Sequence, residues 1–172
     1  MFPLLPVFPL FPATKERFMP APAIRRVVTG HNDDGLAIVA IDDHAKGEIV
    51  TQVWETPGPL SNHIDDWEVG QRQPGPSIPR GSALRFVDIN PGFRSAMHRT
   101  NTIDYVFILD GELEMELDGG EWVHLTAGDI VVQRGTNHAW ENKSDRICRL
   151  ASVLIAAEPA VVNGKPLEPT MV

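Results

Sequence analysis

The stretch GFRSAMHRTNTIDYVFILDG, residues 92–111, decides the fold of this chain. Its second half, residues 104–109, is rich in apolar, aromatic and β-branched residues and stops at Asp110 and Gly111, which favour a turn. A short run of this kind between turn residues is typical of a β-strand. Residues 112–117 then read Glu-Leu-Glu-Met-Glu-Leu, the alternation of a strand with one wet face and one buried face. The stretch therefore predicts consecutive β-strands joined at a glycine turn.

The same pattern continues on both sides of this stretch. Further β-rich segments with turn residues at their ends span residues 24–29, 36–41, 49–54, 84–89, 128–133, 137–142 and 147–156. The first two read as a hairpin through the turn at residues 32–35. Strands at roughly ten-residue spacing with glycine turns indicate an antiparallel sandwich or small barrel. We therefore expect an all-β fold without a helix of more than a turn or two.

Composition sets outer limits on fold and partners. The 172 residues are 42% hydrophobic and 22% charged, which fits one globular domain, and 15 prolines and 14 glycines exclude a bundle of long helices. The single cysteine, Cys148, cannot form an internal disulfide and is expected to be a small buried hydrophobe. A formal net charge of −8 argues against binding nucleic acid or an anionic membrane. We expect a cytoplasmic protein whose partner is a small molecule.

Prolines gather at the start of the chain. Six of them lie in residues 1–22, where Pro3, Pro6, Pro9 and Pro12 alternate with apolar residues. This pattern excludes a helix, a signal peptide and a membrane span, and it favours an extended, polyproline-like arm over residues 1–23. Apolar side chains on such an arm are costly to leave in water. We expect the arm to pack on its own domain or on a second subunit of a homodimer, with a frayed terminus as the alternative.

Five more prolines lie in residues 57–79, which we interpret as a long loop. Loops of this length in a compact domain often cover a site, so the segment is a candidate lid that could bring His63 to a ligand. The domain organisation expected is the arm, a barrel domain at residues 24–157 and a C-terminal tail at residues 158–172.

Three residues could carry chemistry: His98, Asp104 and His138. Gly92, five residues, His98, Arg99, Thr100, three residues, Asp104, six residues and Gly111 resemble the first motif of the cupins, and GDIVVQRGTNHAWEN at residues 128–142 resembles the second. The resemblance implies a double-stranded β-helix, the jelly-roll barrel of that superfamily. It departs from the usual motif at Thr100, where most metal-binding cupins have a second histidine, and at Asp104, where they have glutamate. Arg134 stands where the second motif usually has proline.

The resemblance implies two histidine ligands, His98 and His138, and a carboxylate ligand, Asp104. Two imidazoles and one carboxylate with open positions suit one divalent transition metal, Fe, Mn, Ni or Zn. In the alternative interpretation the metal is lost and the same three residues form a metal-free acid/base site. No glycine-rich phosphate loop and no serine nucleophile elbow is present, so no nucleotide cofactor is expected.

Aromatic and cationic residues suggest substrate contacts. Trp140 has the strand parity of His138 and is expected to form an apolar wall, with plain core packing as the alternative. Tyr105 has the opposite parity to Asp104 and points outward unless a bulge reverses it. Arginines near strands could bind a substrate carboxylate, and the candidates are Arg85, Arg94, Arg99 and Arg149. The expected contact set is Thr100, Tyr105, Trp140 and Arg149. Surface or structural roles are expected for His31, His44 and His124.

Cupins include dioxygenases, decarboxylases, dehydratases, isomerases, epimerases and binding proteins, so the fold alone does not decide the function. The retained histidine pair favours a small-molecule enzyme that performs proton transfer, as in dehydration, decarboxylation or isomerisation. Its substrate would be a carbonyl- or carboxylate-bearing metabolite, aromatic ones included. Two alternatives stay open: a non-haem Fe(II)-dependent oxygenase or oxidoreductase that uses the same residues, and a non-catalytic cupin that binds a small ligand.

Overall fold

The computed structural model of the chain describes residues 23–56, 58, 78 and 80–171. The proline-rich arm expected at residues 1–23, apart from its last residue, lies outside this part. Nearly all of the loop at residues 57–79, the candidate lid with His63, also lies outside the described residues. Within the described residues the regular structure is β-strand, with one short 3₁₀ turn at Asp118–Gly120. No helix in this part is long and apolar enough to cross a membrane.

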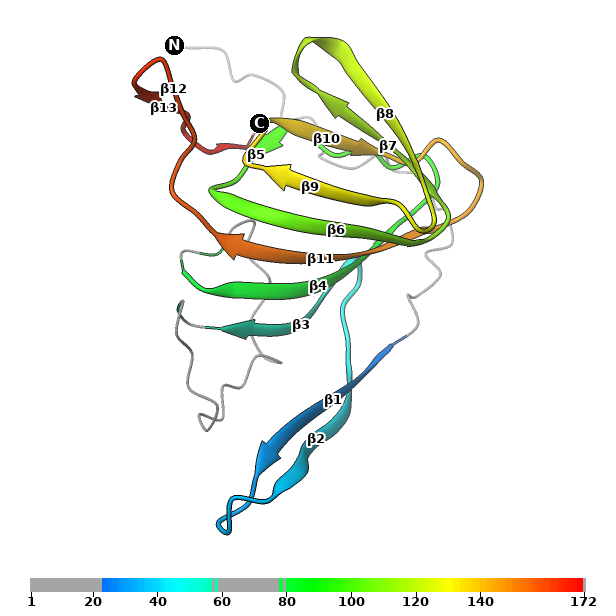
Figure 1. The fold of residues 1–172 in the computed structure, drawn as a ribbon. Coiled ribbons are helices and arrows are strands. Elements are labelled where there is room, and N and C mark those ends of the chain that lie inside the picture. Colours follow the sequence, from blue (N-terminus) through cyan, green and yellow to red (C-terminus); the bar gives the residue numbers. More distant parts are fainter. Residues whose placement is uncertain (1–22, 57, 59–77, 79, 172) are drawn as a thin grey trace, which may run out of the picture.

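Two five-stranded antiparallel sheets face each other and form the barrel (Figure 1). The first sheet has the order β3-β4-β11-β6-β9, and its strands are β3 (Val50–Thr56), β4 (Ser82–Ile89), β11 (Cys148–Ala156), β6 (Thr102–Asp110) and β9 (Ile130–Arg134). The second has the order β14-β5-β10-β7-β8, with β14 (Thr170–Met171), β5 (His98–Arg99), β10 (His138–Glu141), β7 (Glu112–Leu117) and β8 (Glu121–Thr126). This is the double-stranded β-helix that the resemblance to the cupin motifs implies.

The predicted strands are confirmed to within two or three residues at most ends. β5 and the hairpin of β12 (Val161–Val162) and β13 (Lys165–Pro166) were not predicted, because strands this short carry no pattern, and β8 was expected only as a short strand around His124, without bounds. Residues 158–172, expected as a tail, also return to the barrel through β14, which pairs with β5 at the edge of the second sheet. The end of the chain thus borders the strand that carries His98.

Alternation along the strands fills the barrel with apolar side chains. The buried cluster consists of Ile89, Val106, Ile108, Leu113, Met115, Leu125, Cys148 and Leu150. Each fully buried aliphatic side chain of this kind contributes roughly 1.5–3 kcal/mol. Cys148 is 0% exposed within the cluster, and burial raises the pKa of its thiol to about 11. The cysteine is therefore an inert core residue, as the sequence predicts.

Gly111, the last residue of the first motif, has a steric role between β6 and β7. Its φ is +83°, in the left-handed region that side chains disfavour. A Cβ at this position would lie 2.8 Å from both the Cα of Cys148 and the carbonyl oxygen of Ile147. Only glycine fits here because backbone fills the space, and this keeps the turn tight enough for β6 and β7 to belong to different sheets.

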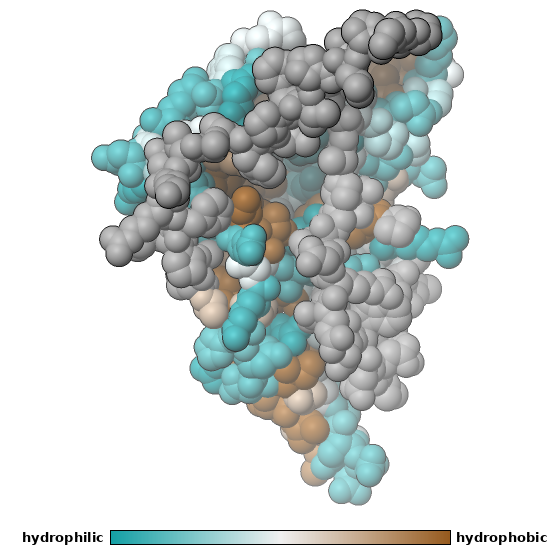
Figure 2. All heavy atoms as spheres, turned by 180° about the vertical axis from the view of Figure 1, so that it is seen from behind, coloured by the Kyte–Doolittle hydropathy of each residue, from teal (hydrophilic) through white to brown (hydrophobic). Residues whose placement is uncertain are grey.

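A separate hairpin extends away from the barrel (Figure 1). It consists of β1 (Ile24–His31) and β2 (Ala37–Ala45), which pair only with each other. Asn32 organises the turn, because its side-chain oxygen accepts hydrogen bonds from the backbone NH groups of Asp34 and Leu36. Several large apolar side chains of the hairpin region remain exposed (Figure 2), namely Val27, Leu36, Ile38 and Val39.

Candidate functional site

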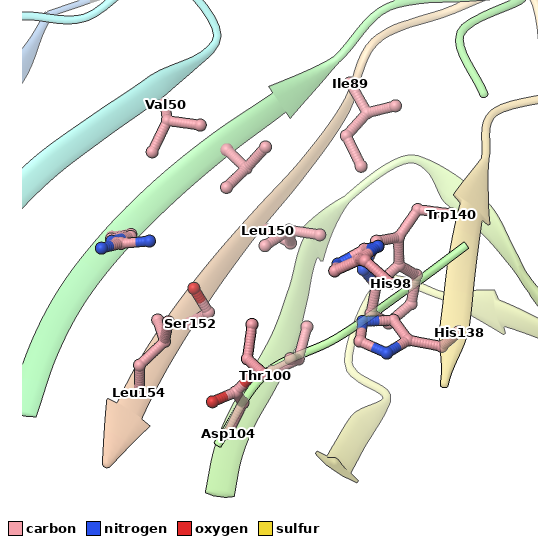
Figure 3. Close-up of a pocket in the computed structure, with 13 residues that line it drawn as sticks. Val50, Ile89, His98, Thr100, Asp104, His138, Trp140, Leu150, Ser152 and Leu154 are labelled. Carbon is pink, nitrogen blue, oxygen red and sulfur yellow. The ribbon is translucent and has the colours of Figure 1, made fainter. Parts of the chain in front are cut away.

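A cavity of about 150 Å³ opens between the two sheets of the barrel (Figure 3). Its polar lining residues are Arg85, His98, Thr100, Asp104, His138 and Ser152, and its apolar ones are Val50, Val87, Ile89, Val106, Trp140, Leu150 and Leu154. Four of the predicted site residues from the two motifs thus meet at one cavity, together with Trp140. An engineered protein cavity of this volume holds a benzene molecule, so a single ring or a chain of similar size fits.

His98 and His138 form one wall of the cavity. They lie opposite each other on the paired strands β5 and β10, with ring centroids 4.2 Å apart and planes inclined by 48°. The Nδ1 of each ring is 2.9 Å from a backbone carbonyl two residues earlier, Ala96 for His98 and Thr136 for His138. Because a carbonyl oxygen only accepts hydrogen bonds, Nδ1 carries the hydrogen in each neutral ring and Nε2 keeps its lone pair. Both Nε2 atoms are therefore bases or ligands.

The charge state of His138 follows from its burial. The residue is 4% exposed, and burial lowers the pKa of its imidazole to about 4. The Thr136 carbonyl raises this pKa, and the charge of His98 lowers it further. At neutral pH the ring is uncharged, as a general base or a metal ligand must be.

Trp140 extends the same wall two residues along β10. Its ring meets that of His138 edge to face, with centroids 5.4 Å apart and an interplanar angle of 78°. The equal strand parity of the two residues predicts this arrangement, and Trp140 lines the cavity as well as packing on the core. Its ring is available as a flat apolar surface for a ligand.

Asp104 lies on the first sheet, on β6. Burial raises the pKa of its carboxyl group, while the Thr102 hydroxyl and the charges of Arg85 and His98 act in the opposite direction. Its Oδ1 atom is buried without a hydrogen-bond partner. The nearby Thr100 hydroxyl is instead bonded to that of Thr102, with 2.7 Å between the two oxygens. Asp104 is thus a carboxyl group that retains its proton to higher pH than usual and has a free oxygen.

The predicted three-ligand metal set does not assemble. In the described part of the chain no three His, Cys, Asp or Glu side chains come together in a way that could hold a metal ion. His98 and His138 remain as a pair of nitrogen ligands, and the donated Nδ1 hydrogens match the usual support of histidine ligands. Asp104 lies on β6 of the opposite sheet and does not form a three-residue group with them. The residues present therefore fit only part of the usual set.

Comparison with known proteins places the fold in a family. The cupin domain model, Cupin_2, matches residues 85–154. The "Cupin-domain-containing oxidoreductase srdB" of Neurospora crassa is 32% identical over 164 residues, which cover 87% of this chain and 83% of that protein. This chain belongs to the cupin superfamily. Another relative of this cupin, the "Phomopsin biosynthesis cluster protein C'" of Diaporthe leptostromiformis, is 38% identical, with 83% of each chain covered.

A solved structure has a similar arrangement of strands. It is an uncharacterised conserved protein with a double-stranded β-helix domain from Klebsiella pneumoniae, with a TM-score of 0.47 and 22% sequence identity. The match covers 63% of this cupin and 76% of that chain.

Two residues of the expected contact set lie away from the cavity, which corrects their assignment as substrate contacts. Tyr105 is 41% exposed and points outward, as its parity predicts. Arg149 forms a two-pronged ion pair with Asp88, with distances of 2.7 and 2.8 Å, and it is absent from the cavity lining. On β11 the even-numbered residues Leu150, Ser152 and Leu154 face the cavity, so the odd-numbered Arg149 faces away from it.

Arg85 is the cavity arginine that sequence reasoning did not single out from its candidates. The other three are paired with acidic residues: Arg94 with Glu116 and Glu141, Arg99 with Asp118, and Arg149 with Asp88. The sequence signal was present in β4, where Arg85 shares its parity with Val87 and Ile89, both of which face inward.

The histidines expected on the surface, His31, His44 and His124, are exposed. His124 pairs with Glu114 on the outside of the barrel.

Proposed function

We propose that this cupin catalyses proton transfer on a small oxygen-bearing metabolite held in the barrel cavity, in a dehydration, decarboxylation or isomerisation. One observation carries the proposal: a neutral imidazole and a carboxyl group with a raised pKa line the same cavity from opposite sheets. Environments that shift the pKa values of two titratable groups in opposite directions are typical of an acid and a base with separate roles.

In a dehydration, Nε2 of His138 takes a proton from the carbon next to a carbonyl group. The Thr136 carbonyl, which accepts the Nδ1 hydrogen, stabilises the imidazolium that forms. The protonated carboxyl group of Asp104 gives its proton to the hydroxyl group that leaves from the neighbouring carbon. A C–H bond and a C–O bond break, a C=C bond forms, and water departs. In an isomerisation, Asp104 instead returns a proton to another carbon of the enol.

The relatives support a role in small-molecule chemistry. Two that cover most of the chain are named as a biosynthesis cluster protein and a cupin-domain-containing oxidoreductase. The Trp140 ring and the volume of about 150 Å³ favour a compact substrate, with a planar or ring portion against the indole.

The name of the Neurospora relative favours a second candidate, an oxidoreductase. Cupins commonly bind a divalent metal, and the Nε2 atoms of His98 and His138, which both line the cavity, suit one. Because the third ligand predicted from the sequence is not in place, no step of this chemistry is assigned to the described residues.

Deuterium exchange tests the first proposal without knowledge of the natural substrate. The full chain is incubated in D₂O with a panel of small hydroxy- and oxo-carboxylates and aldehydes, and NMR follows loss of the proton next to the carbonyl group. We expect exchange that survives exhaustive chelation. Oxygen consumption with stoichiometric iron, lost on chelation, would favour the oxidoreductase. Ligands that bind and are recovered without exchange would leave the non-catalytic binding function.

A further inference from the structure

We propose that Arg85 binds the carboxylate of the substrate, so that the ligands of this cavity are small monocarboxylates. The inference rests on the proposed function in one respect, that the cavity is the substrate site. It adds a recognition residue on the wall opposite the histidines and narrows the substrate class to carboxylic acids.

Arg85 is placed to meet a ligand by its position on β4. It lies two residues before Val87 and four before Ile89 on the inner face of the strand. It pairs in register with Ser152 of β11 and Gln52 of β3. The residue is 6% exposed and lines the cavity. Its neighbours Val87 and Ile89 on the same face are apolar. A guanidinium group therefore stands at the cavity wall with apolar side chains beside it.

The charge of Arg85 lacks a partner in the described part of the chain. Its Nε has no hydrogen-bond partner, and no ion pair of Arg85 is found there. Burial lowers its pKa, while the charges of Glu55 and Asp104 act in the opposite direction. Arg26, Arg94 and Arg149, in contrast, each hold a carboxylate at hydrogen-bond distance. A buried charge without a partner destabilises a fold, so its place is explained by a ligand that supplies the partner.

Asp104 does not fill this role although it faces the same cavity. Its Oδ1 is itself buried without a partner, so the two complementary groups leave each other unsatisfied. A ligand that spans them would satisfy both, with a carboxylate on Arg85 and a hydroxyl group that donates to Asp104. Hydroxy acids and the hydrated or enol forms of oxo acids have this pair of groups.

A carboxylate matches the site better than a phosphate group does. The planar guanidinium fork bonds both anions, but a phosphate monoester has a charge near −2, and among the described residues Arg85 is the one arginine that lines the cavity. The raised pKa of Asp104 keeps its carboxyl group closer to neutral, which lowers repulsion of a singly charged anion. The volume of about 150 Å³ also favours the smaller group.

Calorimetric titration of the full chain with benzoate, benzamide and phenyl phosphate tests the assignment. These probes share a ring of a size that suits the cavity and differ in charge. We expect benzoate to bind about 10- to 100-fold more tightly than benzamide, as a charge-assisted hydrogen bond implies. Equal affinity for benzoate and benzamide, or no binding of benzoate, would overturn the proposal. A preference for phenyl phosphate over benzoate would overturn the carboxylate assignment and identify a phosphoryl subsite.

Variants then attribute the effect to Arg85. We expect Arg85→Met to remove the preference for benzoate and Arg85→Lys to keep part of it. Arg149→Gln, on the outer face of the same sheet, should retain it in full. Arg85→Met should also raise Tm, because it removes an unpaired buried charge, whereas a purely structural arginine would lower Tm on removal. Unchanged benzoate binding in Arg85→Met refutes the inference. If that variant does not fold, Arg85→Lys and the probe comparison on the unaltered chain still decide.

His138→Ala separates this inference from the proposed function. If both hold, the variant loses deuterium exchange yet keeps the preference for benzoate over benzamide, because Arg85 is unaltered. Benzoate binding that depends on Arg85 without any exchange by the unaltered chain would keep the carboxylate subsite and refute proton transfer. If exchange is intact in Arg85→Met and the unaltered chain shows no preference for benzoate, proton transfer is kept and the carboxylate subsite is refuted.

Discussion

The two walls of the cavity differ in how their polar groups are satisfied. On the β5/β10 wall, each histidine donates its Nδ1 hydrogen to a carbonyl of its own strand segment, so the pair is held in place before any ligand arrives. On the opposite wall, formed by the sheet of β4 and β6, Arg85 and Asp104 each keep a buried polar atom without a hydrogen-bond partner. The chain itself orients the histidine pair, whereas Arg85 and Asp104 each have a buried atom left to bond a ligand, and Asp104 is also the proposed acid.

The two walls also differ in the charges that their side chains carry. Burial lowers the pKa of His138 and of Arg85 and raises that of Asp104, so burial moves each group toward its neutral form. The imidazole of His138 is neutral at neutral pH, and the carboxyl group of Asp104 is shifted in the same direction, toward its neutral form, whereas a guanidinium remains charged at any ordinary pH. Arg85 is accordingly the one that needs an anion.

The largest effect is expected on the histidine wall. Substitution His138→Ala removes the proposed base and should slow deuterium exchange by roughly 10²–10⁴-fold, the usual contribution of a general base. His124→Ala is the matched control, because that imidazole is exposed and paired with Glu114. Retention of more than half of the exchange rate in a folded His138→Ala variant would show that the base lies elsewhere.

The next largest effect is expected in how the stability of the fold depends on pH. The imidazole of His138 has a pKa of about 4 in the fold, against 6.5 in an unfolded chain. Between these values the unfolded state binds a proton that the folded state does not, so stability falls as pH decreases from about 6.5 to about 4. The shift corresponds to about 3 kcal/mol over that range. Denaturant unfolding at several pH values should show this slope, and His138→Gln should flatten it. An unchanged slope in the variant would contradict the burial of a neutral ring.

Sequence reasoning reached most of the fold and about half of the site, for physical reasons. Alternation and glycine turns predict the long strands, because a side chain on a strand must face either the core or the solvent. They predict Trp140 and the outward Tyr105 equally well. Two-residue strands such as β5 and β14 carry no alternation, so their pairing depends on tertiary contacts.

The ligand set could not be read from the motif alone. Motif spacing places His98, Asp104 and His138 at one cavity, but the length of the Asp104 side chain and its position on the other sheet decide whether three groups converge. Arg85 and Arg149 illustrate the same limit. Both lie in strands and both could bind a carboxylate, and only the register of β4 against β11 shows which one already has a partner.

A smaller effect is expected from Asp104→Asn. Because the pKa of Asp104 is raised, the folded state keeps a proton that the unfolded state has lost, and this part of the stability disappears as pH rises through that window. The slope is opposite in sign to that of His138. The amide cannot ionise, so the variant should be more stable than the unaltered chain at pH 8. Thermal unfolding at pH 5 and pH 8 measures the difference, and lower stability at pH 8 would mean that the charged carboxylate has a partner.

The smallest effect belongs to Arg149→Gln, the counterpart of Arg85 on the outer face of the same sheet. Its ion pair with Asp88 has side-chain exposures of 23% and 9%, so it is more buried than a surface pair, which contributes about 0.2–1 kcal/mol, and we expect a loss at the upper end of that range that weakens at high salt. Removing the paired outer arginine should therefore destabilise slightly, while removing the unpaired inner one should stabilise. Opposite signs for one residue type on two faces of one sheet would separate an arginine that supports the fold from one reserved for a ligand. A loss of stability for Arg85→Met as well would mean that both arginines serve the fold.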